Sequence, residues 1–198
     1  MNIVTALVFS LLLFCSPSYA QEKVYDLDTQ QSVVSWKGEK LTGSHHGTLK
    51  VNHGKVRFSD EGLTGGTFTL DMTSITNLDI ESDQWRAKLE KHLKSDDFFD
   101  VSHFPEGTFV ITKVHPQDDG YEVVGDLTIK GKTHPISFPA TVTKEGDSYH
   151  ASAKITLDRL KWDIKYNSGK FFDPQKLGDK LIYDEIEIGL ELWTKGAQ

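Results

Sequence analysis

Cysteine is almost absent from this chain of 198 residues, whose single cysteine is Cys15. Cys15 lies in an apolar segment near the N-terminus, so the rest of the chain can form no internal disulfide and offers no thiolate nucleophile. After that segment, no apolar run approaches the roughly 20 residues that a membrane-spanning helix requires. A domain built from this chain must be stabilised by its hydrophobic core and its backbone hydrogen bonds.

Positive charge is scarce as well. The chain has 22 lysine and arginine residues against 29 aspartate and glutamate residues, and its formal net charge is -7. Nucleic acids attract basic surfaces, so this composition argues against a nucleic-acid partner. Anionic membrane surfaces should repel such a chain mildly.

The apolar segment from Val4 to Cys15 has the features of a secretory signal peptide. It is too short to span a bilayer comfortably, and small residues occupy the positions just before Gln21. We predict a signal peptide over residues 1–20, cleavage between Ala20 and Gln21, and a single mature domain over residues 21–198. That domain is expected in the periplasm or outside the cell. The alternatives are a lipoprotein signal at Cys15, which the preceding Phe14 disfavours, and a retained helix.

Beyond residue 30, apolar residues recur at every second position in short runs. Val34 and Trp36 alternate with Ser35 and Lys37, for example. The same alternation is found in the segments 67–73, 108–112, 126–130, 136–142, 151–157 and 185–192. A period of two is typical of strands that bury one face and expose the other.

Residues that favour turns separate these segments. Glycine with Asn or Asp occurs at 52–54, 60–62, 118–120, 145–147 and 167–169. Short turns join antiparallel neighbours, and about eight such strands would expose unpaired edges unless the sheet closed. We predict an all-β fold, a closed antiparallel barrel of about eight strands; a two-sheet sandwich is the alternative.

One segment departs from this pattern. From Ser82 to Ser95, Trp85, Leu89 and Leu93 recur at helical spacing. Ser82 is suited to the N-cap position. The segment predicts one short amphipathic helix lying across the sheet or across a barrel opening.

The residues that carry catalysis or bind metals are scattered. His45 and His46 are adjacent, so on a strand they point to opposite faces, and the other histidines form no ligand motif. The sequence also lacks a nucleophile elbow and a phosphate-binding glycine loop. We predict no metal site and no catalytic residues. The alternative is a periplasmic enzyme or metal-binding stress protein that uses the scattered His and Asp residues.

Several aromatic residues fall in irregular segments after the predicted helix and near the last hairpin. They are Phe98, Phe99, Phe104, Trp162, Phe171 and Phe172. Such residues pack a core in most proteins, but around a barrel opening they would also suit a hydrophobic ligand. Both interpretations remain open at this point.

The same segments resemble the YceI-like family. The stretch from His92 to Val101, continued by Phe104-Pro105 and Thr108-Phe109, resembles the hallmark of that family. Gly125 to Thr133 is similar to its second signature. Further similar stretches lie at 36–38, 45–48, 162–166, 168–173 and 177–180, so the likeness extends from Val24 to Trp193.

The resemblance implies a lipocalin-like antiparallel β-barrel, exported from the cytoplasm, that binds a long isoprenoid or other lipid chain. We therefore predict a carrier for an apolar lipid, quinone-like or prenyl-phosphate-like, with no cofactor besides such a lipid. A homodimer is compatible with this prediction. A structural or interaction module without a ligand is the other alternative.

The phase of the strands predicts which residues face the lipid. The predicted lining is Trp36, Phe68, Leu70, Phe109, Leu127, Ile129, Phe138 and Ile155, with Phe98, Phe99, Phe171 and Phe172 near the entrance. A ligand with a charged headgroup could be held at the entrance by Arg86, Lys88 or Lys170.

Overall fold

A computed structural model describes residues 22–196, which form mostly β-strands. The predicted signal peptide and the bond between Ala20 and Gln21 lie outside the described residues. The strands are β1 (Lys23–Asp26), β2 (Val33–Lys40), β3 (Gly43–Ser59), β4 (Gly62–Asn77), β5 (Glu106–Gln117), β6 (Gly120–Ile129), β7 (Lys132–Glu145), β8 (Ser148–Asp158) and β9 (Ile182–Trp193). The helical segments are α1 (Asp83–Lys94), η1 (Arg159–Trp162), α2 (Pro174–Leu177) and η2 (Gly178–Lys180).

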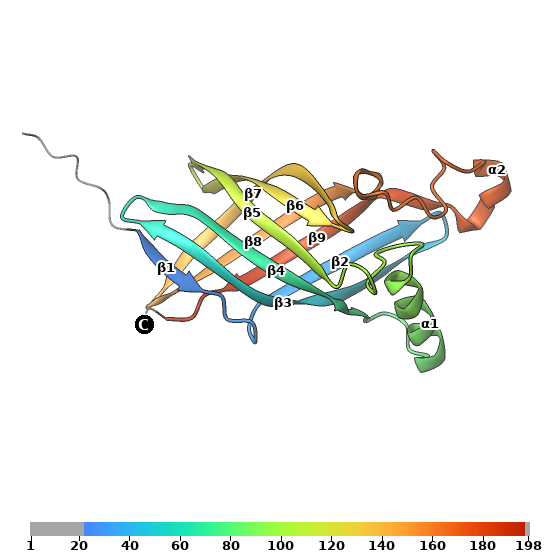
Figure 1. Cartoon of the computed structure of the whole chain (residues 1–198), viewed down its shortest axis with the longest axis horizontal. Helices are drawn as coiled ribbons and strands as arrows, with labels where there is room; N and C mark the ends of the chain where they lie inside the picture. The colour runs from blue at the N-terminus through green and yellow to red at the C-terminus, as the bar shows by residue number, and fades with distance from the viewer. Residues whose placement is uncertain (1–21, 197–198) are drawn as a thin grey trace, which may run out of the picture.

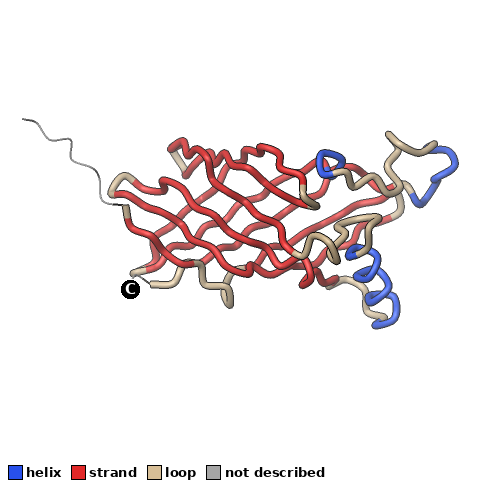
Figure 2. The backbone as a smooth tube through the Cα atoms, in the orientation of Figure 1, coloured by secondary structure: helices blue, strands red, loops and turns tan. Residues whose placement is uncertain are grey.

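The strands β2 to β9 form an antiparallel meander that closes on itself. Each of these strands pairs with the next, and β9 returns to pair with β2, where Trp36 lies opposite Ile188. Strand β1 adds to the second half of β3, with Tyr25 opposite Val56. The result is an elongated eight-stranded barrel with one extra strand (Figures 1 and 2). The predicted all-β barrel is confirmed, and the two-sheet sandwich is wrong because the β2–β9 pairing closes the sheet.

The hydrophobic core lies inside the barrel. In β4, Phe68, Leu70 and Met72 are buried, whereas Thr67 and Thr73 are exposed. This alternation follows from the extended backbone, in which successive side chains point to opposite faces of the sheet. The inward residues of neighbouring strands therefore meet in the lumen.

Four of the five predicted turn segments fall outside strands or at strand junctions, but the segment Asn52-His53-Gly54 lies within β3. A register shift between Val51 and His53 marks a bulge against β4. The imidazole of His53 lies 3.2 Å from the hydroxyl oxygen of Thr69 on β4. Turn-favouring residues therefore serve here to bend a long strand, as β-bulges do.

Helix α1 confirms the predicted helix to within one residue at each end. Ser82 occupies the N-cap position, but its side chain makes no capping hydrogen bond. Leu93 is buried in the core, whereas Trp85 is 58% exposed and carries the Lys88 ammonium over its ring. Figure 1 places α1 at the same end of the barrel as α2, opposite the end that holds β1.

A partly buried carboxylate, that of Asp79, ties the start of β3 to the segment that leads into α1. Asp79 accepts hydrogen bonds from the His46 amide at 2.8 Å, the His45 ring at 2.8 Å and the Asn77 amide group at 2.6 Å. Burial opposes ionisation of Asp79, but these hydrogen bonds prevail and lower its pKa from 3.8 to about 2. Glu90 of α1 in turn accepts from the Asn77 backbone N–H.

We expect Asp79→Asn to lower the free energy of unfolding by about 2 kcal/mol near pH 5. This is the free energy that corresponds to the lowered pKa of Asp79 in the folded state. Because the folded-state pKa is depressed, the stabilisation is present above pH 4 and is lost as pH falls from 4 to 2. Urea unfolding of both proteins at several pH values between 5 and 2 measures this. The exposed turn variant Asp118→Asn is the control, and a difference that stays constant down to pH 2 would contradict the assignment.

Candidate functional site

The barrel encloses an apolar cavity of about 140 Å³. Every strand from β2 to β9 contributes to its wall, and the wall surface is apolar throughout. Trp36, Leu70, Met72 and Ile155 are among the lining residues. For comparison, an apolar cavity of about 150 Å³ in another protein stays dry and binds benzene. The cavity as it stands therefore accommodates a short hydrocarbon segment.

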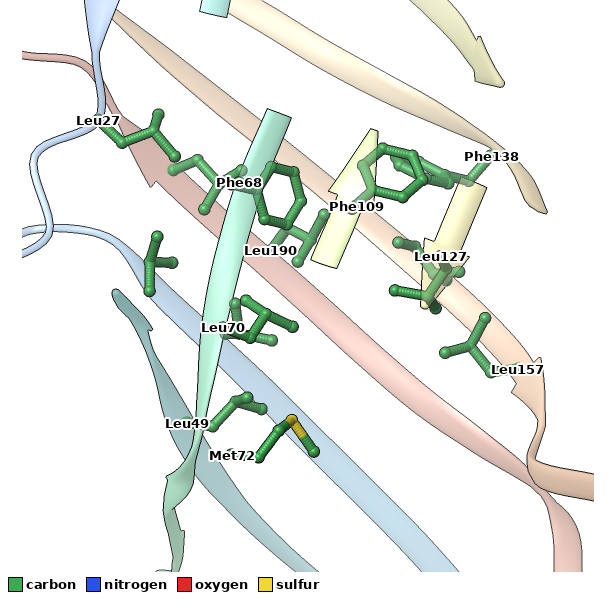
Figure 3. Close-up of a cluster of buried hydrophobic side chains, with 14 of the residues drawn as sticks. Leu27, Leu49, Phe68, Leu70, Met72, Phe109, Leu127, Phe138, Leu157 and Leu190 are labelled. Atoms are coloured by element: carbon green, nitrogen blue, oxygen red, sulfur yellow. The ribbon is translucent and has the colours of Figure 1, made fainter. Parts of the chain in front are cut away.

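A second apolar cavity, of about 60 Å³, lies deeper in the barrel. Four residues belong to the walls of both cavities: Phe68, Phe109, Phe138 and Leu190. Their side chains lie next to one another in Figure 3. The ring centroid of Phe109 is 5.3 Å from that of Phe68 and 5.6 Å from that of Phe138. These three phenylalanines and Leu190 separate the two cavities, and we call the four residues together the aromatic layer.

An aromatic cluster covers the far end of the second cavity, near the termini. Phe58 and Tyr149 stack with centroids 3.8 Å apart, and Tyr25 meets both rings edge-on. Phe58 and Tyr149 also line the second cavity. The burial of Tyr149 raises the pKa of its hydroxyl group. Packed rings thus occupy the end of the barrel at β1, where the exposed Lys55 also lines the second cavity.

The opposite end of the first cavity is formed by residues from outside the strands. Leu93 of α1 and Phe98 and Phe99 of the following loop line the wall there. Tyr166 contacts Phe98 at 5.3 Å and His92 at 4.6 Å between ring centroids. Tyr183 lines the same cavity and is 43% exposed, so the cavity approaches solvent at the end that carries the helices.

A buried arginine holds the backbone of this end together. Arg159 begins η1 and is only 2% exposed. Its guanidinium donates hydrogen bonds to the carbonyl oxygens of Ile164, Ile182 and Tyr183 at 2.8–3.2 Å, and it pairs with Asp184 at 3.3 Å. Burial lowers the pKa of Arg159, and Asp184 counteracts this effect. Arg159 therefore fastens the segment 163–181 where it leaves and rejoins the barrel.

Comparison with known proteins agrees with this architecture. A model of the YceI-like domain matches residues 25–193, nearly all of the described chain. The chain belongs to the YceI-like family. It is 29% identical over 165 residues to Protein YceI of Salmonella newport, covering 79% of this chain and 84% of that protein.

Two solved structures share the fold of this YceI-like chain. Burkholderia cenocepacia BcnA superposes with a TM-score of 0.70 at 23% identity, over 85% of this chain and 99% of that one. A polyisoprenoid binding domain from Saccharophagus degradans superposes with a TM-score of 0.61 at 13% identity, over 87% and 98% of the two chains. The lipocalin-like barrel is thus the fold of this chain.

The cavity brings together most of the predicted lining residues. The wall contains Trp36, Phe68, Leu70, Phe98, Phe99, Phe109, Leu127, Ile129, Phe138 and Ile155. Their contact with a ligand stays a prediction. Phe171 and Phe172 do not line either cavity and are 52% and 50% exposed. Their backbone N–H groups both bond to the Ser168 carbonyl in a turn outside the barrel, and Lys165 lies over the Phe171 ring.

Several wall residues were missed by the prediction from sequence. The strand residues among them include Val34, Met72, Leu157 and Leu190, all of which share the inward phase that identified their neighbours. Arg159 and Ile164 also line the cavity but lie outside the alternating segments. No periodic signal could have identified these two.

The three basic residues proposed for a headgroup lie outside the cavity wall and have protein partners. Arg86 pairs with Asp83 and donates to the Ile80 carbonyl oxygen. Lys88 lies over Trp85, and Lys170 is 3.5 Å from Asp184. Lys170 is connected to the Arg159 network, because Lys170 and Arg159 both pair with Asp184.

Within residues 22–196, no three His, Cys, Asp or Glu side chains gather in a way that could hold a metal ion. None of the helices in the same range has the length and apolar character needed to cross a membrane.

We expect Arg159→Ala to lower the free energy of unfolding by about 3 kcal/mol, because it leaves three carbonyl oxygens and Asp184 without their buried donor. Lys161→Ala, at an exposed position of the same η1 segment, is the matched control and should change stability by less than about 0.5 kcal/mol. Urea unfolding monitored by circular dichroism measures both. Equal effects of the two variants would show that Arg159 does not fasten this end.

Proposed function

We propose that this chain is an exported binding protein that holds the hydrocarbon part of an isoprenoid or another apolar lipid inside its barrel. The apolar cavity bounded by the eight strands and α1 carries this proposal. Removing apolar surface from water contributes roughly 25 cal/mol per Å², so a chain of methyl and methylene groups gains affinity without polar contacts. The name of the Saccharophagus degradans neighbour, a polyisoprenoid binding domain, supports the same ligand class.

The size of the cavity adds a requirement. At about 140 Å³ it holds a short segment, so a long chain enters only if interior side chains change rotamer. Met72 and Ile182 line the wall, and unbranched Met is among the most adaptable side chains in protein interiors. A long ligand should therefore bind with rearrangement of the flexible aliphatic residues.

A polar headgroup belongs at the entrance in this proposal. Among the described residues, the only charged side chain that lines the first cavity is Arg159, and its guanidinium is engaged by backbone carbonyl oxygens and Asp184. An uncompensated quinone or phosphate group in the apolar interior would lose its hydration without gaining partners. The headgroup should remain near Tyr183, where the cavity approaches solvent.

Export to the periplasm or beyond is part of the same proposal. Its support is the predicted signal peptide over residues 1–20. An apolar chain that leaves one membrane needs shelter from water on its way to another site, and a closed barrel provides that shelter. The quinone-like and prenyl-phosphate-like classes differ in their headgroups, and the apolar cavity wall favours neither class.

We expect the exported protein to carry a co-purifying apolar lipid in its cavity. Organic extraction and native mass spectrometry of protein isolated from the periplasm or medium measure this. The variant Leu70→Lys places an ammonium group on the cavity wall and should lower lipid occupancy at least tenfold, since a buried charge without a partner is strongly unfavourable.

The matched control is Thr73→Lys, which places the same side chain at an exposed position of the same strand that lines neither cavity. It should retain the lipid of the parent protein. Leu70→Gln serves as a milder variant if Leu70→Lys does not fold. Equal occupancy in folded Leu70 and Thr73 variants would contradict binding in this cavity.

A further inference from the structure

The aromatic layer formed by Phe68, Phe109, Phe138 and Leu190 lies between the two cavities of the lumen. Its members come from β4, β5, β7 and β9, so strands on different sides of the barrel meet at this level. Phe68 and Phe109 are also direct cross-strand partners. Phe109 in turn lies beside Phe138, and Figure 3 shows the three rings and Leu190 in one region of the lumen.

Phe109 is the most tightly held member of this layer. Its side chain is 2% exposed and lies between the rings of Phe68 and Phe138. The tip of its ring occupies the space above Gly125 on β6, where an added Cβ would come within 2.3 Å of it. A glycine at this position leaves space for the ring against β6, and the surrounding contacts leave it little room to change rotamer.

The two cavities on either side of the layer are both apolar but unequal. The larger one, about 140 Å³, approaches solvent at Tyr183, and the smaller one, about 60 Å³, lies between the layer and the rings of Phe58 and Tyr149. A hydrocarbon chain that enters from the helix-bearing end reaches the aromatic layer before it reaches the smaller cavity. Space suited to the next part of the chain lies directly behind the layer.

We propose that the aromatic layer sets the length of hydrocarbon chain that the barrel accepts, and that Phe109 is the residue that defines this limit. The inference rests on the proposed function, because it concerns the same cavity and the same ligand class. Chain units that reach the layer gain apolar contact, whereas units beyond it remain outside the entrance. The smaller cavity is a terminal subsite that becomes available only when the layer opens.

The test uses linear prenols of increasing length, from geraniol through farnesol and geranylgeraniol to longer members. Their affinities are measured by displacement of a fluorescent apolar probe, and native mass spectrometry counts bound molecules. For the parent protein, each added isoprene unit should tighten binding by roughly tenfold while it finds apolar space inside, since two buried methylene groups already give about that factor. Beyond a limiting length the affinity should stop rising.

In Phe109→Ala the two cavities merge, so the limit should move to longer prenols and the longest ones should bind at least tenfold more tightly than to the parent protein. Phe104→Ala is the matched control, because Phe104 packs against Gly131 and lines neither cavity. It should keep the parent limit. Since truncation of a buried Phe costs about 3–5 kcal/mol, Phe109→Leu provides a second, milder variant.

The outcomes separate this inference from the proposed function. Two results would overturn the aromatic layer as a length limit: an affinity that keeps rising with prenol length, or an unchanged limit in a folded Phe109 variant. Neither result would contradict binding inside the barrel. If the parent protein takes up no prenol and no other apolar chain, both proposals fail. A limit that shifts in Phe109→Ala and Phe109→Leu but not in Phe104→Ala supports the assignment.

Discussion

Closure of the sheet between β2 and β9 is the constraint on which the rest of this structure depends. Each of the eight barrel strands thereby gains a partner on both sides, which satisfies its backbone hydrogen bonds. The same closure turns all inward side chains toward one lumen. An eight-stranded barrel is just wide enough for side chains to fill it or to hold one small ligand. The volumes of a few inward residues therefore decide whether the interior is solid or hollow.

The two ends of the barrel are closed in different ways. Near the termini, Tyr25, Phe58 and Tyr149 pack ring against ring. At the other end the chain leaves the sheet and returns to it, so backbone groups lose their ladder partners and need others. Arg159 and Asp79 supply those partners to the segments that they fasten. The end with the more elaborate polar support is also the one where the first cavity approaches solvent.

Prediction from sequence succeeded where one short-range rule acts alone. The alternation around Phe68 and Leu70 predicts an inward face, and the closed barrel places that face on the cavity. It failed where several influences compete. The residues Asn52-His53-Gly54 favour a turn, yet pairing with β4 keeps them in a bulged strand. The place of Phe171 and Phe172 near the entrance stays a prediction; a local turn around Ser168 leaves both side chains exposed and off the two cavity walls.

By itself, the sequence determined the strand segments, the helix near residues 83–94 and membership of a barrel family, because alternation, helical spacing and motif order are local properties of the chain. Only the tertiary structure decided that the lumen contains two cavities divided by Phe68, Phe109, Phe138 and Leu190. It also decided that Arg159 is buried under one end. These features depend on which side chains meet across the barrel, and that is settled by register and closure between residues far apart in the chain.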